Sequence, residues 1–405
     1  MQQKRLLVLA AGILQAPIIK RAHEMGYYVI AADGNPEASG LQYADKAICA
    51  NITNEEEMVE IAKREKIDGV IHPCSEVSMN VMGRIHDELN LSGISRKQAV
   101  VATNKHLMRE AFKKGDAPSP ISVLAKSAED AWEQFQIFDG DGILKPSRNS
   151  GSRGIAKVVK PSTSSGTGTV REEFIHLYDV ALEESRDNSV LIEQFIEGPE
   201  FSVEIIVWEG KVNVLTVTDK KTTESPHFVE LGHNQPSCFP ADTVAIIKDT
   251  AIRGVKALGV DKCACHAEVK VMDGKAYLME IGARMGGDFI STVLTRLSTG
   301  VDMVAAAIDC ALNIEPDLTP KAAPQGVCIR YFCPKPGELK IISNTEVMND
   351  SRVHEWEIFH KEGDMIPEVT SSLCRSGYVI VTEETPQKAI ELAERMISEV
   401  IIVTE

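Results

Sequence analysis

Two glutamates and an arginine lie close together in the stretch 268–288, which reads EVKVMDGKAYLMEIGARMGGD. Glu268 and Glu280 each lie in an apolar run typical of a β-strand, and the Asp-Gly pair between the runs is typical of a tight turn. Such a hairpin would place the two carboxylates side by side, where they can bind Mg²⁺. Arg284 follows shortly afterwards and is suited to stabilise a phosphoryl group in transfer. A surface hairpin with a salt bridge is the alternative for this stretch alone.

A lysine followed by small residues is the second candidate. Lys145 ends the strand-like run Gly142–Lys145 and precedes the sequence PSRNSGSRG. Small residues allow backbone N–H groups to approach phosphate oxygens, and the ammonium neutralises charge. The lysine precedes the glycines and no helix-opening GK[ST] follows, so this is not a P-loop. A Gly/Ser turn after a strand is the alternative. The small residues of this loop are Ser150, Gly151, Ser152 and Gly154.

The third candidate is the stretch 191–204, LIEQFIEGPEFSVE, which predicts two strands joined at a Gly-Pro turn. The backbone of Gln194, Phe195 and Ile196 could hydrogen-bond an adenine, on whose ring Phe195 or Ile196 could pack. Glu200 opens the second strand, where it could accept hydrogen bonds from ribose hydroxyls. A solvated acidic hairpin is the alternative.

Strands and helices alternate over residues 1–103, which predicts a parallel α/β domain. Gly12 and Asp33 imitate the dinucleotide-binding fingerprint, in which the acid follows the glycines by about 20 residues. This chain has one glycine where the fingerprint has three, and Gln15 and Pro17 occupy the turn. NAD binding is therefore only an alternative. The strands are expected at 5–11, 27–32 and 69–72, and the helices at 17–25 and 54–66.

Beyond a helix at 104–117, two prolines mark a linker, and the pattern changes to an α+β type. The stretch 218–240 is predicted to be irregular, and loops of that length in compact domains are usually functional or disordered. Two further prolines separate a last unit that begins near residue 319. Helices are expected at 127–138, 171–186, 242–258, 301–312 and 386–399.

Composition limits the classes of function. A chain of 405 residues is long enough for about two to four domains. Its formal net charge of -16 disfavours binding to nucleic acid or to an anionic membrane. The nine cysteines form no CxxC pair, and Cys263, Cys265 and His266 lack a fourth zinc ligand nearby. Without a signal peptide or an apolar run of membrane-spanning length, a cytoplasmic protein is expected.

The order of these candidates carries more information than any one of them. A lysine at the start of a helix near residue 105, the strand lysine with its small-residue loop, EQFIEGPEFSVE and the final MEIGAR together resemble the ATP-grasp ligase superfamily over residues 5–310. The resemblance implies a mixed α/β and α+β fold in which two lobes clamp ATP. The implied parts are a Rossmann-like N-terminal domain (1–103), an ATP-grasp domain (104–318, with lobes at about 121–196 and 197–318) and a small α+β C-terminal domain (319–405).

The resemblance also implies a role for each motif, with ATP and Mg²⁺ or Mn²⁺ as cofactors. Arg284 and Lys145 would be the catalytic residues, and Arg284 would hold the γ-phosphate and an acyl phosphate. Glu268 and Glu280 would bind the metal, although many members have an asparagine where this chain has Gly282, which leaves the number of ions open. The other implied nucleotide contacts are Lys105, Lys145 and the loop 150–154 at the phosphates, Glu193, Gln194, Phe195 and Ile196 at the adenine, and Glu200 at the ribose.

Within the superfamily, the chain looks most similar to L-amino acid ligases and related carboxylate–amine ligases. The similarity rests on the run RMGGDFI, on the run FVELGHNQPS at 228–237, and on the appended C-terminal unit. By analogy, Glu76 and Asp288 would face the substrate pocket together with Gly286 and Gly287. His227 and His233, in the long loop, would line the acceptor site.

The activity that the resemblance implies is ATP-dependent formation of an amide bond between a carboxylate and an amine. An acyl phosphate would be the intermediate, and ADP and phosphate would be released. A purine-biosynthesis ligase of the phosphoribosylglycinamide type, a non-catalytic ATP-binding regulatory protein and an NAD oxidoreductase are the alternatives. The sequence leaves the two substrates open, and a homodimer is the commonest assembly for such enzymes.

Overall fold

The computed structural model describes residues 3–149, 153–160, 168–223 and 228–405. The N-terminal part is a four-stranded parallel sheet with helices packed on it, so the predicted parallel α/β fold is confirmed. Its strand order is β3-β2-β1-β4. The strands are β1 (Arg5–Leu9), β2 (Tyr28–Asp33), β3 (Lys46–Cys49) and β4 (Gly69–Ile71). The helices are α1 (Ala16–Glu24), α2 (Glu55–Glu65), α3 (Met79–Leu89) and α4 (Arg96–Ala102), with a 3₁₀ turn at Leu41–Tyr43.

The fingerprint-like turn after β1 is occupied by the chain's own groups. The two carboxylate oxygens of Asp33 accept hydrogen bonds from the backbone N–H groups of Ala11 and Asn35, both at 2.8 Å. Gln15 is buried and donates to the carbonyl oxygen of Pro73 at 2.9 Å. Asp33 therefore stabilises the turn itself, which argues against the NAD alternative.

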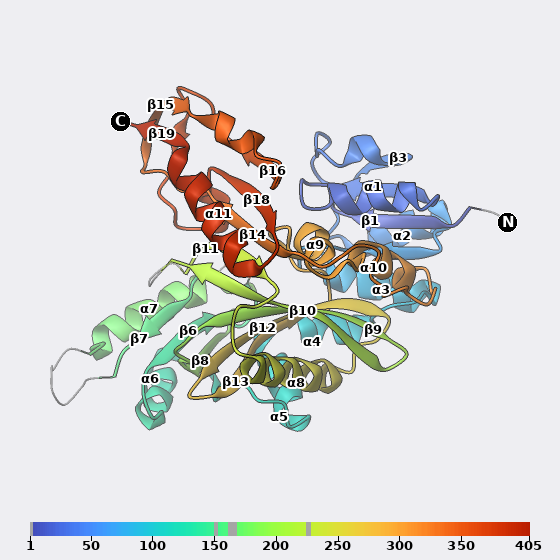
Figure 1. The fold of residues 1–405 in the computed structure, drawn as a ribbon. Helices are drawn as coiled ribbons and strands as arrows, with labels where there is room; N and C mark the ends of the chain where they lie inside the picture. Colours follow the sequence, from blue (N-terminus) through green and yellow to red (C-terminus); the bar gives the residue numbers. More distant parts are fainter. Residues whose placement is uncertain (1–2, 150–152, 161–167, 224–227) are drawn as a thin grey trace.

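A small antiparallel lobe follows the helix α5 (Lys105–Lys114). Its four-stranded sheet has the order β5-β8-β6-β7, and two helices cover it (Figure 1). Phe135 and Phe174 from these helices stack with ring centroids 5.6 Å apart and fill the core of the lobe. The elements are β5 (Ser122–Ala125), α6 (Ala128–Ile137), β6 (Gly142–Pro146), β7 (Ala156–Val158), α7 (Arg171–Glu183) and β8 (Val190–Gln194).

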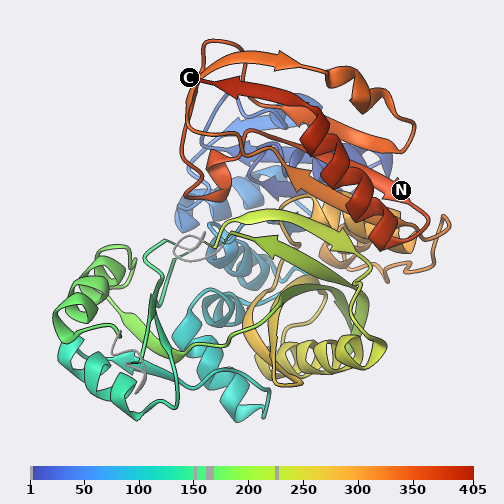
Figure 2. The same ribbon diagram turned by 60° about the vertical axis from the view of Figure 1, so that its left-hand side comes forward.

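An eight-stranded sheet forms the centre of the molecule, with the order β13-β12-β9-β10-β11-β14-β18-β16. Strands on both sides of residue 319 belong to it, so the C-terminal unit continues the sheet of the large lobe (Figure 2). Its strands are β9 (Glu200–Trp208), β10 (Lys211–Thr222), β11 (Glu230–Gln235), β12 (Cys263–Met272), β13 (Lys275–Gly282), β14 (Gly326–Tyr331), β16 (Val353–Ile358) and β18 (Gly377–Glu383).

Helices pack on both faces of this sheet, and a second small sheet, β17-β15-β19, closes the C-terminal unit. None of the described helices combines the length and apolar character needed to cross a bilayer. The remaining elements are α8 (Ala241–Leu258), a π-helical turn at Ile290–Leu294, α9 (Thr295–Thr299), α10 (Met303–Ala311), β15 (Gly337–Ser343), 3₁₀ turns at Thr345–Asn349 and Ser372–Cys374, β17 (Met365–Ile366), α11 (Pro386–Glu399) and β19 (Ile401–Thr404).

The prediction that 218–240 is irregular is wrong for most of its described part. Strand β10 continues to Thr222, and β11 begins at Glu230 and pairs with both β10 and β14. His233, Asn234 and Gln235 are all buried in β11. Polar residues on a buried strand remove the apolar alternation by which a strand is recognised, and only their tertiary partners allow them to be buried.

Candidate active site

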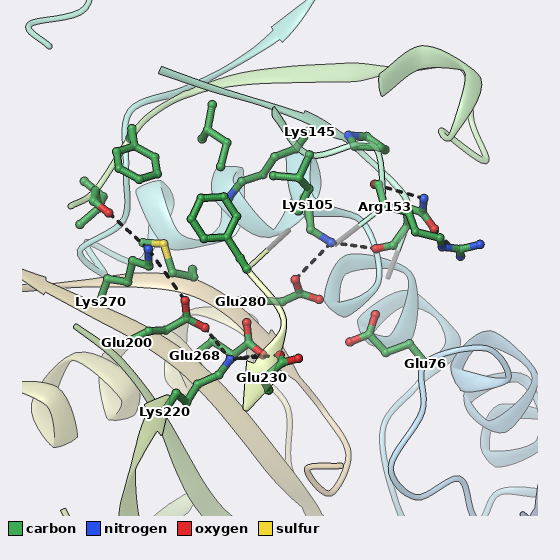
Figure 3. Close-up of a pocket in the computed structure, with 18 of the residues that line it drawn as sticks. Glu76, Lys105, Lys145, Arg153, Glu200, Lys220, Glu230, Glu268, Lys270 and Glu280 are labelled. Atoms are coloured by element: carbon green, nitrogen blue, oxygen red, sulfur yellow. Dashed lines mark hydrogen bonds and ion pairs between the residues drawn. The ribbon is translucent and has the colours of Figure 1, made fainter. Parts of the chain in front are cut away.

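A cavity of about 350 Å³ lies between the small-lobe sheet and the large sheet (Figure 3). It collects side chains from the small lobe, from β10, β12 and β13 of the large sheet, and from the loop after β4. Its lining residues are Cys74, Ser75, Glu76, Lys105, Ile143, Lys145, Pro146, Asn149, Arg153, Ile155, Gln194, Phe195, Ile196, Glu200, Lys220, Phe228, Glu230, Glu268, Lys270, Met279, Glu280 and Arg284. Three separate sequence motifs therefore converge on one site.

The predicted carboxylate hairpin is present. Glu268 on β12 and Glu280 on β13 are directly opposite each other in an antiparallel pair. At the turn, Asp273 has φ +51° and Gly274 has φ +71°. These left-handed conformations are those that an Asp-Gly hairpin turn requires. The turn sets the register of the pairs nearest to it, up to Val269 opposite Leu278. A register shift between Glu268 and Val269 then brings Glu280, in place of Met279, opposite Glu268.

The electrostatic environment keeps Glu268 ionised. Burial alone would raise the pKa of its carboxyl group, but Lys220 and His266 outweigh burial and hold the pKa well below its usual range. The ammonium of Lys220 lies 3.5 Å from Glu268, and Nε2 of His266 lies 3.7 Å away. The carboxylate is therefore available as a ligand for a cation.

The donor set fits Mg²⁺ bound together with a phosphate. In the described residues, no group of three or more His, Cys, Asp or Glu side chains could hold a metal ion alone. Mg²⁺ in phosphate-transfer sites is commonly bound by one or two carboxylates plus substrate phosphates and water. Glu268 and Glu280 supply two carboxylates on one wall of the cavity, so the ion would need further oxygen ligands from a bound nucleotide.

Two further cations, Lys105 and Arg284, line the cavity beside this carboxylate pair. Nζ of Lys105 lies 3.1 Å from Glu280 and donates to the carbonyl oxygen of Asn149 at 3.0 Å. Burial alone would lower the pKa of Lys105, but Glu280 and Glu76 outweigh burial and raise it. Arg284, at the end of the hairpin, lies 3.2 Å from Glu76. Lysine and arginine at these positions suit a polyanionic ligand.

The motif predicted that Glu193 contacts the adenine, but Glu193 is not among the residues that line the cavity. It is completely buried, with Arg109 and Lys145 each 2.9 Å away. Burial alone would raise the pKa of Glu193, but these two cations outweigh it and lower the pKa to about 2. Arg109 also donates to the carbonyl oxygen of Met279 at 2.8 Å. The carboxylate therefore connects Lys145 to helix α5 and, through Arg109, to the strand that carries Glu280.

Replacing Glu193 with glutamine should lower the free energy of unfolding by about 3 kcal/mol, because two buried cations lose their counter-charge. The wild-type carboxylate has a folded pKa of about 2, below its ordinary value of 4.5. Its stabilisation is therefore complete above pH 4.5 and is lost as the pH falls toward 2. Urea unfolding of both proteins across this range should show the difference shrinking at low pH. A pH-independent difference would contradict the ion-pair explanation.

The other end of the cavity is suited to a nucleoside. Gln194, Phe195 and Ile196 line it, as the motif predicts in position. The ammonium of Lys157 lies 4.3 Å from the Phe195 ring centroid, and that of Lys270 lies 5.3 Å from it. Glu200 is ion-paired with Lys220, and Lys270 lies 3.9 Å from its carboxylate. An aromatic ring beside a strand-end backbone and a carboxylate can contact a base and a sugar.

The remaining predicted residues lie in different places. Glu76 and the loop residues next to Gly154 line the cavity, whereas the described lining does not include Gly286, Gly287 or Asp288. Asp288 instead pairs with Arg375 and His233, and these two outweigh burial and hold its pKa below the usual range. Ser150, Gly151, Ser152 and His227 lie outside the described residues.

Sequence reasoning missed several lining residues, above all Lys220, Glu230 and Lys270. Lys220 is almost buried and lies among three carboxylates, those of Glu200, Glu230 and Glu268 (Figure 3). Burial alone would lower the pKa of Lys220, but these carboxylates outweigh burial and raise the pKa well above its usual value. The lysine lies in the stretch that was predicted to be irregular, so no pattern in the sequence indicated it.

Comparison with known families agrees with this geometry. A family model of the ATP-grasp domain matches residues 140–293, and a model of the L-amino acid ligase C-terminal domain 2 matches residues 330–405. Alanine–anticapsin ligase of Bacillus subtilis is 25% identical over 292 residues, which cover 69% of this chain and 61% of that protein. Carnosine synthase 1 of Gallus gallus is 32% identical over 146 residues, 36% of this chain and 16% of that protein. The chain thus spans less than two thirds of these relatives.

Solved structures show the same fold over the whole chain. Phosphoribosylglycinamide synthetase from Anaerococcus prevotii is 25% identical with a TM-score of 0.79, and 100% of both chains is covered. L-amino acid ligase from Bacillus licheniformis is 20% identical with a TM-score of 0.84, again with 100% of both chains covered. The chain thus contains an ATP-grasp domain at 140–293 and an L-amino acid ligase C-terminal domain at 330–405, on a fold that it shares with these solved structures over its whole length.

Proposed function

We propose that this protein is an ATP-dependent carboxylate–amine ligase that acts on amino acids. The observation that carries the proposal is the convergence of Lys105, Lys145, Arg284 and the opposed pair Glu268 and Glu280 on one cavity. Two carboxylates beside three cations are suited to bind a nucleotide triphosphate with its metal ion and to stabilise phosphoryl transfer. The alanine–anticapsin and L-amino acid ligases among the similar proteins support the choice of substrate class.

In this proposal the nucleotide lies along the cavity. Phe195 packs on the adenine, the backbone of Gln194 and Ile196 hydrogen-bonds its edge, and Glu200 accepts from the ribose hydroxyls. Lys105 and Lys145 neutralise the phosphates. Glu268 and Glu280 would hold Mg²⁺, which neutralises phosphate charge when bound. Mn²⁺ has the same preference for oxygen ligands and should replace it.

The chemistry proceeds in two steps. A substrate carboxylate oxygen attacks the γ-phosphorus of ATP, the bond to the β-phosphate oxygen breaks, and ADP and an acyl phosphate form. Arg284 stabilises the negative charge on the transferred group. An amine then attacks the acyl carbon, phosphate leaves, and the ammonium proton is lost to solvent or a neighbouring base. The lobes on either side of the cavity limit the access of water, which would hydrolyse the acyl phosphate.

The direct test is an assay of ADP release against pairs of amino acids, with the products identified by mass spectrometry. We expect one ADP for each amide formed, and no ADP release when the carboxylate substrate is omitted. Tight ATP binding without phosphate release for any pair would instead support a regulatory ATP-binding protein.

A second candidate is a ligase of the phosphoribosylglycinamide type, favoured by the full-length similarity to the Anaerococcus prevotii synthetase. The same assay distinguishes it, because such an enzyme would release ADP with phosphoribosylamine and glycine and not with two amino acids. The match to an L-amino acid ligase C-terminal domain favours the first candidate.

We also propose a cytoplasmic location and a homodimer. Sedimentation of the full chain at several concentrations should give twice the mass of 44.3 kDa. A single species with the mass of the monomer would refute the homodimer and would leave the proposed ligase activity untouched.

Replacing Phe195 with alanine should weaken nucleotide binding by about 1–3 kcal/mol, which is the usual contribution of an aromatic ring stacked on a base. The variant should keep its maximal rate at saturating ATP, because Phe195 is remote from the transferred phosphoryl group in the proposed pose. Titration with a fluorescent ADP analogue measures the affinity. Replacement of Phe239, which packs on Phe201 outside the cavity lining, serves as the control. An unchanged affinity for the ADP analogue in the Phe195 variant would show that the adenine does not bind against Phe195.

A further inference from the structure

A segment of the C-terminal unit, residues 370–376, contacts Glu230 of the cavity wall and Asp288, which lies just after Arg284 in the chain. Arg375 in this segment forms a bidentate ion pair with Asp288, in which Nη1 and Nη2 each lie 2.7 Å from a carboxylate oxygen. The Arg375 side chain is only 9% exposed, and its Nε donates to the carbonyl oxygen of Ser372 at 2.8 Å. Its guanidinium also lies 3.6 Å from the ring centroid of Tyr331. The arginine is therefore held in one orientation by partners on both sides.

The same segment holds a residue of the cavity wall. The hydroxyl of Ser372 donates to a carboxylate oxygen of Glu230 at 2.8 Å, and Nη1 of Arg375 donates to the Glu230 carbonyl oxygen at 3.3 Å. Glu230 lines the cavity and lies 3.7 Å from the ammonium of Lys220. Both the backbone and the carboxylate of this wall residue thus depend on the C-terminal unit.

Asp288 ends the short loop that begins at Arg284. Asp288 and Phe289 have φ values of +52° and +61°, in the left-handed region that non-glycine residues rarely adopt. Such conformations persist only where the surroundings enforce them. Here the partners of Asp288 are Arg375, His233 with Nε2 at 3.1 Å, and the hydroxyl of Tyr331 at 3.4 Å from its carbonyl oxygen. The bidentate pair is therefore a main constraint on the loop that carries Arg284.

We propose that Arg375 is a positioning residue, through which the C-terminal unit fixes Glu230 and the 284–289 loop and so completes the substrate end of the site. The proposal rests on the proposed ligase function for its kinetic consequence only. Of the residues proposed for the nucleoside, Gln194, Phe195 and Ile196 have no contact with the 370–376 segment in the described structure, and Glu200 is linked to it only indirectly, because Glu200 and Glu230 share Lys220. Arg375 should therefore affect the use of the carboxylate and amine substrates more strongly than the binding of the nucleotide.

The test uses Arg375→Met and Arg375→Lys in the full chain, with Asp288→Asn as a nearly isosteric second variant. Arg352→Met is the control, because Arg352 belongs to the same C-terminal unit and is also ion-paired, with Asp350 and Glu383. None of these three residues is among those that line the cavity. Hydrogen–deuterium exchange in the presence of MgADP is the first readout. We expect exchange in peptides covering 284–290 and 228–235 to accelerate about tenfold or more in Arg375→Met. Arg375→Lys should recover part of the protection from exchange, since a lysine keeps the positive charge but cannot form the bidentate hydrogen bonds of a guanidinium.

The second readout is kinetic. The KM for amino acids should rise about tenfold in Arg375→Met and Asp288→Asn. The dissociation constant for MgADP should stay within about twofold of the wild-type value. A purely structural role would lower thermal stability without this separation of amino acid and nucleotide affinities. Unchanged exchange in both peptides, or equal effects from Arg352→Met, would overturn the proposal.

The two proposals fail in different ways. A wild-type protein that forms no amide, together with accelerated exchange in the Arg375 variants, would refute the ligase function and keep the positioning role. A fully active Arg375→Met variant with wild-type exchange would keep the ligase function and refute the positioning role.

Discussion

Replacement of Arg284 with methionine should lower kcat by about 10³-fold or more, because an arginine on a transferring phosphoryl group supplies an effect of that size. The guanidinium lines the cavity beside the hairpin that holds the two opposed glutamates, and it is 3.2 Å from Glu76. Its proposed role is confined to the transition state, so kcat and kcat/KM for the amino acid should fall together. Rapid-quench measurement of ADP formation checks the chemical step directly.

Two further variants make this result interpretable. Arg284→Lys keeps the positive charge but lacks the planar guanidinium group, and it should therefore recover only part of the lost rate. Arg253→Met removes a partly exposed arginine, paired with Asp116, from helix α8 and should leave kcat unchanged. An Arg284→Met enzyme within a few-fold of the wild-type rate would exclude Arg284 from phosphoryl transfer.

Replacement of Glu280 with glutamine should lower kcat by about 10²–10³-fold, the usual effect of removing one group that stabilises transition-state charge. The substitution keeps the shape of the side chain and removes one of the two proposed metal-binding carboxylates. The fold should remain intact, because Glu280 is at the cavity surface with its side chain 21% exposed. The apparent affinity for Mg²⁺ should weaken as well, which titration of the metal at saturating ATP measures.

The control for this prediction is Glu197→Gln, which removes an exposed carboxylate near the Gly-Pro turn before β9. It should leave both the rate and the Mg²⁺ dependence unchanged. A Glu280→Gln variant with near wild-type turnover would rule out the metal role of the hairpin. Both variants should unfold in a single cooperative transition like the wild type, with Glu280→Gln less stable by no more than the loss of its ion pair with Lys105, which separates loss of chemistry from loss of structure.

The sequence alone determined the features that depend on local chemistry. The Asp-Gly turn predicted the hairpin, which the structure contains, although Glu280 lies opposite Glu268 only because the register shifts between Glu268 and Val269. The alternation of apolar strands and helices predicted the N-terminal parallel sheet. The order of motifs predicted the ATP-grasp fold, since that order reflects the path of the chain through the site.

Only the tertiary structure decided what happens to buried charges. Glu193 lies in a motif that suggested an adenine contact, yet its partners Arg109 and Lys145 come from a helix and a strand far away in sequence. Lys220 is buried among three carboxylates from three other strands, and Arg375 reaches Asp288 from the C-terminal unit. A charged residue at such a position looks like a surface residue in the sequence. Its burial is stable only with a counter-charge, and that counter-charge is brought to it only by the folded chain.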